Sequence, residues 1–385
     1  MDIFELDKKY IAGTYNRFPV NLIYGLGSLV FDEMDRRYID LTSGIGVTAF
    51  GHSDEEWTKA VITQINKLAH VSNLYYTNPD VKLAELLCKK TGMNKVFFSN
   101  SGAEANECAI KAARKYSAKK GEDCYTIMTL ENSFHGRTLT TLAATGQEHY
   151  HELYTPLTPG FVYAETNMES VKSLAETTKI AGIMIECIQG EGGVNVLPAD
   201  FVRELAEYTK ENDIPLIIDE VQTGNGRTGQ LYAYMNYKIS PDIVTTAKGL
   251  GGGLPIGACL LSEKFADVFG YGDHGSTFGG NPIACAGAFS IISRLDDDFL
   301  ADVKRKGVLV KSLLDGAKGV ESVCGMGLMI GIKTTKPAGE VVKKCIEKGV
   351  LVLTAKDKVR LLPPLNINDD MLIEAINIIK EVCRE

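Results

Sequence analysis

Residues 245–258 read TTAKGLGGGLPIGA, and one lysine in this stretch bears on both fold and function. Lys248 follows the apolar run DIVTTA (242–247), and four glycines fall within the next five residues. The apolar run predicts a buried strand, and glycines leave the space beside its end free of side chains. A surface lysine in a turn would produce the same pattern, so the neighbouring segments must decide between a site and a turn.

Apolar runs typical of buried strands alternate along the chain with helical patterns. The strand candidates lie at 95–99, 125–130, 182–188, 215–219, 242–247 and 257–261. The helical patterns lie near 54–69, 79–90, 102–119, 199–212 and 281–295. This order predicts an α/β domain with a mainly parallel sheet.

The last part of the chain has a different pattern of expected helices and strands. Helical patterns at 298–317, 337–348 and 370–384 alternate there with short strands near 328–332, 350–354 and 358–362. We therefore expect a smaller α+β domain at this end.

The composition excludes several classes of protein. The 385 residues carry a net charge of −8, which disfavours nucleic acid as a partner. Nine scattered cysteines without a C-x-x-C pair indicate reduced thiols in a cytoplasmic protein. No apolar run is long enough for a membrane span or a signal peptide, and the six histidines form no H-x-x-x-H pair, so neither a membrane nor a metal site is expected.

The run TGNGRTG (223–229) matches G-x-G-x-x-G after a strand, as in dinucleotide-binding proteins. A dinucleotide site would need a helix to open there and an acidic residue at the end of the next strand. The aromatic run LYAYMNY follows instead, and Asp242 begins the next strand. The motif therefore does not indicate a nicotinamide or flavin site.

Three modest signals follow three strand candidates. Ser101 and Glu104 have capping-box spacing, and Gly102 opens a helix whose free N–H groups could bind an anion, although a simple capped helix fits too. Asp219 ends an apolar strand and could pair with a protonated ring nitrogen, or only with solvent. Lys248 could form a Schiff base with an aldehyde. Together the three supply what pyridoxal phosphate needs.

With these motifs in place, the chain resembles the class III aminotransferases of fold type I along nearly its whole length. The motifs that carry the resemblance are NSGAEANE (100–107), FHGRT (134–138), ECIQGEGGV (186–194), IIDEVQTGNGRTG (217–229), TTAKGLGGGLPIGA (245–258), HGSTFGGNP (274–282) and VRLLPPLNI (359–367). The resemblance implies a large cofactor-binding domain (51–280) with a mainly parallel seven-stranded sheet. It also implies a small α+β domain built from both termini (1–50 and 281–385).

The resemblance further implies how pyridoxal phosphate is held. Lys248 binds its aldehyde and later carries the proton, while Asp219 keeps the ring nitrogen protonated. Phe134 and Val221 cover the two ring faces, and Gln222 lies near the phenolic oxygen. The glycines after Lys248 then leave room for substrate.

The phosphate of the cofactor is expected on the backbone of Gly102 and Ala103. By the same resemblance Thr277 reaches the phosphate bound by the neighbouring subunit. The protein is therefore expected to be a homodimer with shared active sites.

The substrates implied are an ω-amino donor, with N-acetylornithine the first choice, and 2-oxoglutarate, which becomes glutamate. Arg137 matches the residue that clamps a substrate carboxylate, Ser276 is a weaker contact, and Tyr15 with Arg17 could close the pocket. Ile45 stands where ornithine δ-aminotransferases have a tyrosine, which counts against free ornithine. Succinylornithine, ornithine and 4-aminobutyrate remain alternatives, and a cofactor-binding regulator is disfavoured because no basic DNA-binding module is present.

The resemblance also implies that two further residues adapt the site to each of the two substrates in turn. Arg360 matches the arginine that binds the second carboxylate of 2-oxoglutarate, and Glu191 matches the carboxylate that neutralises it while the ω-amino donor is bound. A fixed structural ion pair is the alternative interpretation.

Overall fold

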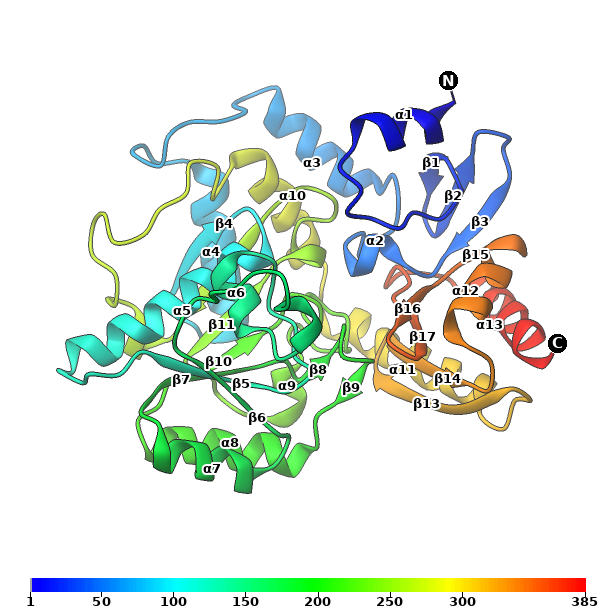
Figure 1. Cartoon of the computed structure of the whole chain (residues 1–385). Helices are drawn as coiled ribbons and strands as arrows, with labels where there is room; N and C mark the ends of the chain where they lie inside the picture. The colour runs from blue at the N-terminus through cyan, green and yellow to red at the C-terminus, as the bar shows by residue number, and fades with distance from the viewer. Residues whose placement is uncertain (1) are drawn as a thin grey trace.

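The computed structural model describes residues 2–385, and its centre is a seven-stranded sheet (Figure 1). The strand order is β4-β12-β11-β10-β7-β5-β6, and only β12 runs antiparallel to its neighbours within it. The strands are β4 (Lys95–Ser99), β12 (Gly257–Leu261), β11 (Ile243–Thr246), β10 (Leu216–Asp219), β7 (Ile180–Ile185), β5 (Thr126–Leu130) and β6 (Phe161–Ala164). The predicted mainly parallel seven-stranded sheet is confirmed.

Helices cover both faces of this sheet, because alternate strand residues are apolar on both sides. Helix α5 (Gly102–Lys119) packs on one face, against residues such as Ile217 of β10. Helices α7 (Met168–Thr177) and α8 (Ala199–Glu211) belong to the core on the other face, which includes Ile218. Figure 1 shows these two helices together below the sheet.

The second lobe is built from both ends of the chain. One four-stranded sheet has the order β1-β2-β3-β15, and a second has the order β13-β14-β17-β16. Strand β15 (Val350–Leu351) runs parallel to β3 (Arg37–Asp40), which joins the C-terminal region to the N-terminal region. Helices α11 (Asp297–Leu314), α12 (Ala338–Glu347) and α13 (Asp369–Arg384) cover these strands, and both chain ends lie on this side of the molecule (Figure 1).

Three helices lie side by side next to the large sheet. Helix α10 (Pro282–Ser293) packs against α3 (Glu55–Ile65) and α4 (Asn78–Thr91).

The proposed domain boundaries after residues 50 and 280 stay predictions. The other elements are α1 (Ile3–Tyr10), β1 (Leu22–Leu26), β2 (Leu29–Asp32), α2 (Ser43–Gly46), α6 (Leu139–Ala144), η1 (Glu148–Tyr150), β8 (Ile188–Gln189), β9 (Asn195–Val196), α9 (Tyr234–Tyr237), η2 (Lys248–Leu250), η3 (Glu263–Phe265), β13 (Val320–Met326), β14 (Met329–Thr334), β16 (Leu353–Ala355) and β17 (Lys358–Leu361).

The structure differs from the sequence-based expectation at one strand that bears on the site. The run 182–188 is not one strand: β7 ends at Ile185, and β8 starts a short hairpin with β9. Glu186 lies at this break, where its carboxylate accepts two backbone N–H groups. Strands β1, β2, β3, β6, β9 and β13 and helices α1, α2, α6, α7 and α9 were not predicted, and the strand expected near 350–354 is divided into β15 and β16, which belong to different sheets. Within residues 2–385 no helix is both long and apolar enough to cross a bilayer.

Candidate active site

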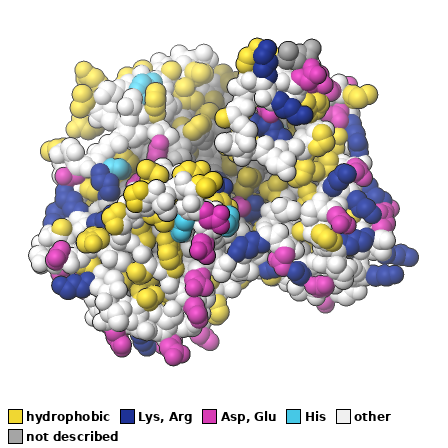
Figure 2. All heavy atoms as spheres, viewed as in Figure 1, with side chains coloured by type: hydrophobic (Ala, Val, Ile, Leu, Met, Phe, Trp, Pro, Cys, Tyr) yellow, Lys and Arg dark blue, Asp and Glu magenta, His cyan; other side chains and the backbone are white. Residues whose placement is uncertain are grey.

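The predicted strand-end residues meet at one edge of the large sheet. Strands β4, β10 and β11 run in the same direction, so the loops that follow them open on the same side. Asp219, Lys248 and the start of α5 line one cavity of about 410 Å³ there. Figure 2 shows that the molecule is hollowed where the two lobes meet.

Lys248 begins the short turn η2. Its φ of 45° is a left-handed backbone conformation that residues other than glycine rarely adopt. Its amine makes no hydrogen bond or ion pair within residues 2–385. Burial lowers the pKa of this amine, and the Glu191 carboxylate opposes the shift without cancelling it. The structure therefore presents a strained, unpaired lysine that loses its proton more readily than a free one.

Asp219 is held rigidly at the end of β10. Its Oδ2 accepts from Asn106 Nδ2 and from His135 Nδ1, each at 2.8 Å, and its Oδ1 accepts from the Val221 N–H at 2.9 Å. The Thr245 hydroxyl donates to Asn106 Oδ1 at 2.6 Å, which fixes the amide in turn. Asp219 is only 3% exposed, so the orientation of its carboxylate is set before any ligand arrives.

The N-terminus of α5 forms another wall of the cavity. The Ser101 hydroxyl caps it by accepting from the Glu104 N–H at 3.2 Å. The Glu104 carboxylate bonds the N–H of Asn100 rather than that of the cap residue, so the predicted capping box forms only in part. The N–H groups of Gly102 and Ala103 meet no acceptor within the described chain, which leaves two donors at the positive end of an 18-residue helix.

Gly102 also permits a close approach between two parts of the wall. A Cβ at this position would lie 2.6 Å from Val221 Cγ1, which is closer than side-chain carbons pack. A larger residue at 102 would therefore displace Val221 from its place in the cavity wall.

Glu191 and Arg360 form an ion pair, although they come from different lobes. Arg360 Nη1 lies 2.6 Å from Glu191 Oε1, and Gln222 bonds both residues at 3.0 and 3.1 Å. Burial would raise the pKa of Glu191, but Arg360, Lys248 and Gln222 together lower it. The Arg360 side chain is 3% exposed, and its Nε has no partner among residues 2–385.

Arg137 is held very differently from Arg360. It lines the cavity, is exposed, and forms no ion pair with any residue from 2 to 385. Its guanidinium carbon lies 5.5 Å from the Phe134 ring centre and 4.4 Å from that of Tyr150. The Arg137 guanidinium is therefore free to bind one carboxylate through two parallel hydrogen bonds.

Glu186 ties two loops of the site together. Its Oε1 accepts from the Phe134 N–H at 2.9 Å, and its Oε2 accepts from the Gly190 N–H at 3.3 Å. Burial raises the pKa of this carboxyl to about 7, with nearby His135 opposing and Asp219 adding to the shift.

Six of the predicted residues do not line the cavity: Glu191 and Arg360 reach it only through Gln222, and Ser276, Thr277, Tyr15 and Arg17 lie outside it. Ser276 bonds Asn100 Nδ2 at 3.1 Å, and Thr277 beside it is exposed. Tyr15 is also exposed, and Arg17 pairs with Asp7 at 3.0 Å rather than reaching the site. Their predicted roles stay predictions.

Sequence reasoning missed five residues at the site. Asn106, His135 and Glu186 lie inside the quoted motifs, so the signal was present but only their neighbours were considered. Thr245 opens the quoted lysine stretch, and Tyr150 lies in a segment with no recognised motif.

Comparison with known proteins places this arrangement in a family. The family profile described as "Aminotransferase class-III" matches residues 10–383. The chain is 48% identical to the acetylornithine aminotransferase of Haemophilus ducreyi, with 100% of this chain and 98% of that protein aligned. It is 44% identical to the acetylornithine aminotransferase of Methanocaldococcus jannaschii, over 99% and 98% of the two chains. The chain belongs to the class III aminotransferases.

Solved structures agree with this placement. The ornithine aminotransferase of Toxoplasma gondii superposes with a TM-score of 0.94 at 29% identity, over 99% of this chain and 94% of that one. The N-acetylornithine aminotransferase of Stenotrophomonas maltophilia gives 0.85 at 33% identity, over 99% and 98%. The large sheet and its helices are thus those of an aminotransferase.

Proposed function

We propose that this protein transfers the terminal amino group of N-acetylornithine to 2-oxoglutarate, with pyridoxal phosphate as cofactor. The products are N-acetylglutamate semialdehyde and glutamate. The observation that carries the proposal is a pair of unlike arginines: Arg137 lines the cavity without a carboxylate partner, and Arg360, neutralised by Glu191, hydrogen-bonds the cavity-lining Gln222. The relatives named above support the choice of donor.

The residues fit pyridoxal phosphate on several independent observations. The free N–H groups of Gly102 and Ala103 would hold its phosphate, as helix N-termini hold anions. The unpaired amine of Lys248 would hold its aldehyde end. Asp219, a buried carboxylate fixed by neutral groups and an imidazole, would keep a proton on its ring nitrogen.

When bound, this cofactor supplies an electrophilic aldehyde carbon and a ring that withdraws electrons from the reacting carbon. The chain supplies the proton transfer. Because burial lowers the pKa of Lys248, its Nζ loses its proton more readily, and it could then take a proton from the reacting carbon of the substrate and deliver it to the cofactor. Phe134 and Val221 would exclude water from the two faces of the ring, and Gln222 would donate to its phenolic oxygen.

Arg137 would bind one carboxylate in both halves of the reaction. N-acetylornithine has a single carboxylate, whereas 2-oxoglutarate has two, so the second substrate needs a second cation. Arg360 provides it, and Glu191 pairs with Arg360 while the donor is bound. An unpaired guanidinium there would be costly in a site that excludes water, and it would attract the wrong group.

We also propose that two copies of the chain complete each other's sites. Thr277 is exposed beside a second cavity, which Asn73 and Leu74 also line. Leu74, Tyr75 and Phe278 are exposed as well, and such an apolar patch is typical of an interface. In a homodimer Thr277 would reach the phosphate bound by the partner subunit. Cytoplasmic location is part of the same proposal.

A panel of amino donors with 2-oxoglutarate as acceptor tests the function. We expect kcat/KM for N-acetylornithine to exceed that for ornithine and 4-aminobutyrate by more than about tenfold, since a site built for one polar group rejects its absence. N-succinylornithine belongs in the panel, because it distinguishes the acyl group. Equal values for 4-aminobutyrate and N-acetylornithine would contradict the proposal.

A further inference from the structure

One aromatic side chain beside the Arg137 fork has no assigned role. Tyr150 ends the turn η1, and its ring centre lies 4.4 Å from the Arg137 guanidinium carbon, closer than the ring of Phe134. The Tyr150 ring also meets the Phe134 ring edge-on, with centres 5.6 Å apart and planes at 65°. The three side chains therefore form one contiguous group at the cavity.

The backbone around Tyr150 is anchored to the loop that carries Arg137. Gln147, only 6% exposed, donates from Nε2 to the Ser133 carbonyl at 3.0 Å. The Tyr150 N–H donates to the Gln147 carbonyl at 3.1 Å, and the His149 ring lies 3.9 Å from the Tyr150 ring. The position of the tyrosine is thus fixed relative to Ser133, which immediately precedes the FHGRT motif.

A guanidinium that rests on an aromatic ring keeps its N–H groups free, because they lie in the plane of the group. Those edges are what a carboxylate binds with two parallel hydrogen bonds. Aromatic contact also attracts the cation, so it limits the conformations of a long and otherwise unpaired side chain. Among the described residues the other ring in contact with the Arg137 guanidinium is that of Phe134, which lies farther away at 5.5 Å.

We propose that Tyr150 is a positioning residue for substrate binding, whose ring holds the Arg137 guanidinium ready for the substrate carboxylate. The inference rests on the proposed function, in which Arg137 binds that carboxylate. The ring and not the hydroxyl carries the role. Because Arg137 serves both substrates, loss of the ring should raise KM for N-acetylornithine and 2-oxoglutarate by similar factors and leave kcat nearly unchanged.

Binding of an unreactive analogue to the purified holoenzyme tests this by isothermal titration calorimetry. N-acetylnorvaline has the acyl group and the carboxylate but no terminal amine, and its primary amide lacks the carboxylate. The wild type should bind the acid more tightly than the amide, and Arg137→Gln should lose the difference. Tyr150→Leu should weaken binding of the acid by about five- to tenfold, within the range of a cation–π contact, and leave the amide unchanged.

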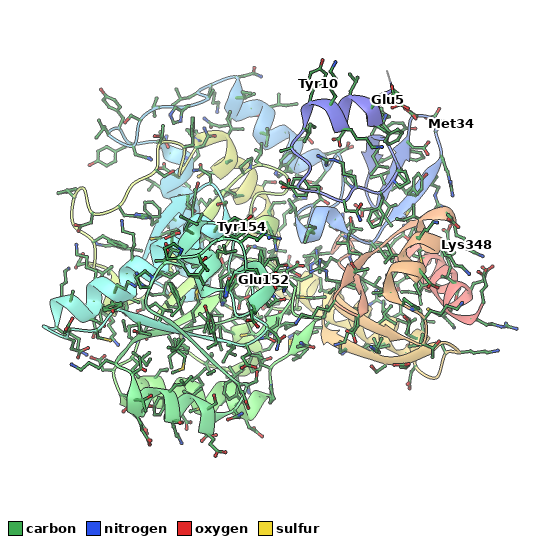
Figure 3. The ribbon with its side chains drawn as sticks, viewed as in Figure 1. Glu5, Tyr10, Met34, Glu152, Tyr154 and Lys348 are labelled. Carbon is green, nitrogen blue, oxygen red and sulfur yellow. The ribbon has the colours of Figure 1, made fainter. Side chains whose placement is uncertain are left out.

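Two variants separate the ring from other effects. Tyr150→Phe should bind the acid within about twofold of the wild type, since the aromatic face is kept. Tyr154→Leu is the matched control: Tyr154 lies further along the same segment (Figure 3) and is exposed, and within residues 2–385 its ring makes no contact with Arg137. Tyr150→Met replaces Tyr150→Leu if the latter does not fold.

The outcomes distinguish the inference from the proposed function. A wild type that binds acid and amide alike would contradict the role of Arg137 and the inference with it. A preference for the acid that is undiminished in Tyr150→Leu would overturn the inference alone. Loss of that preference in Tyr150→Phe would overturn it too, because the hydroxyl would then be the group that acts.

Discussion

Two parts of the site differ in how their polar groups are held. The strand-end wall consists of Asp219, Lys248 and the start of α5, and the loops around it carry Glu191 and Thr277. In the wall, Asp219 receives three hydrogen bonds from its own chain, and its supporting amide, Asn106, is itself fixed by Thr245. In the loops, Thr277 is exposed, and Glu191 faces one arginine across the gap between the lobes. The wall is complete in one chain, whereas the loops offer groups that a partner or a substrate can engage.

This difference assigns separate tasks to the two regions. Fixed groups suit a cofactor that stays bound, because their orientation is settled in advance and costs nothing at the moment of reaction. Groups with few or exchangeable partners suit molecules that arrive and leave, as the two substrates must. We therefore expect changes in the wall to abolish the chemistry and changes in the loops to alter assembly or substrate preference.

The largest effect on activity is expected from removing the amine of Lys248 in the strand-end wall. Lys248→Ala should lower kcat by at least about 10⁴-fold, a loss typical of the central catalytic residue of an enzyme, and the visible absorbance of the bound cofactor should be lost. Lys348→Ala is the matched control, since Lys348 lies in the other lobe next to α12, where it pairs with Glu381 (Figure 3). Normal turnover of Lys248→Ala would remove Lys248 from the mechanism.

A mixture of two inactive variants tests whether the Thr277 loop serves the partner subunit. In a dimer of one Lys248→Ala and one Thr277→Ala subunit, one site would have both residues intact. Random exchange should then restore about a quarter of wild-type activity, since half of the dimers are mixed and each has one working site. Thr277→Ala alone must first be shown to be strongly impaired. No recovery after exchange, verified with differently tagged subunits, would mean that Thr277 acts within its own chain.

The sequence predicted the wall better than the loops, and the reason is physical. Lys248 and Asp219 follow continuous apolar runs, and strands that run in parallel bring their ends to one edge. The break at Glu186 was missed, because one glutamate inside an apolar run does not show that its carboxylate will be buried and satisfied by two backbone N–H groups. Tyr150 was missed for a related reason: its ring contact joins segments that only tertiary packing brings together.

The placing of the Glu191–Arg360 pair shows the same limit. The two residues are 169 positions apart, and composition or periodicity gives no sign that they meet. Only the resemblance to a family suggested the pair, and the structure then supplied the contact. Whether the pair opens during the reaction is a separate matter, which single-turnover measurements can decide.

The smallest effect, and the most informative one, is expected from Glu191. Arg360 is buried, so Glu191→Ala leaves a guanidinium that repels the amine of the donor and still attracts a second carboxylate. The half-reaction with N-acetylornithine should slow by about tenfold, whereas the half-reaction with glutamate should stay the same or improve. Cofactor absorbance in single turnovers measures each half separately.

Arg360→Ala should have the reverse effect, because the dicarboxylate then loses its second cation and the donor loses nothing it uses. Glu340→Ala, at an exposed position of α12, controls for the loss of one negative charge from the protein. If both Glu191→Ala and Arg360→Ala slow both halves equally, the ion pair does not exchange and only supports the structure. If the two variants act in opposite directions, the loops set the substrate preference while the wall carries the chemistry.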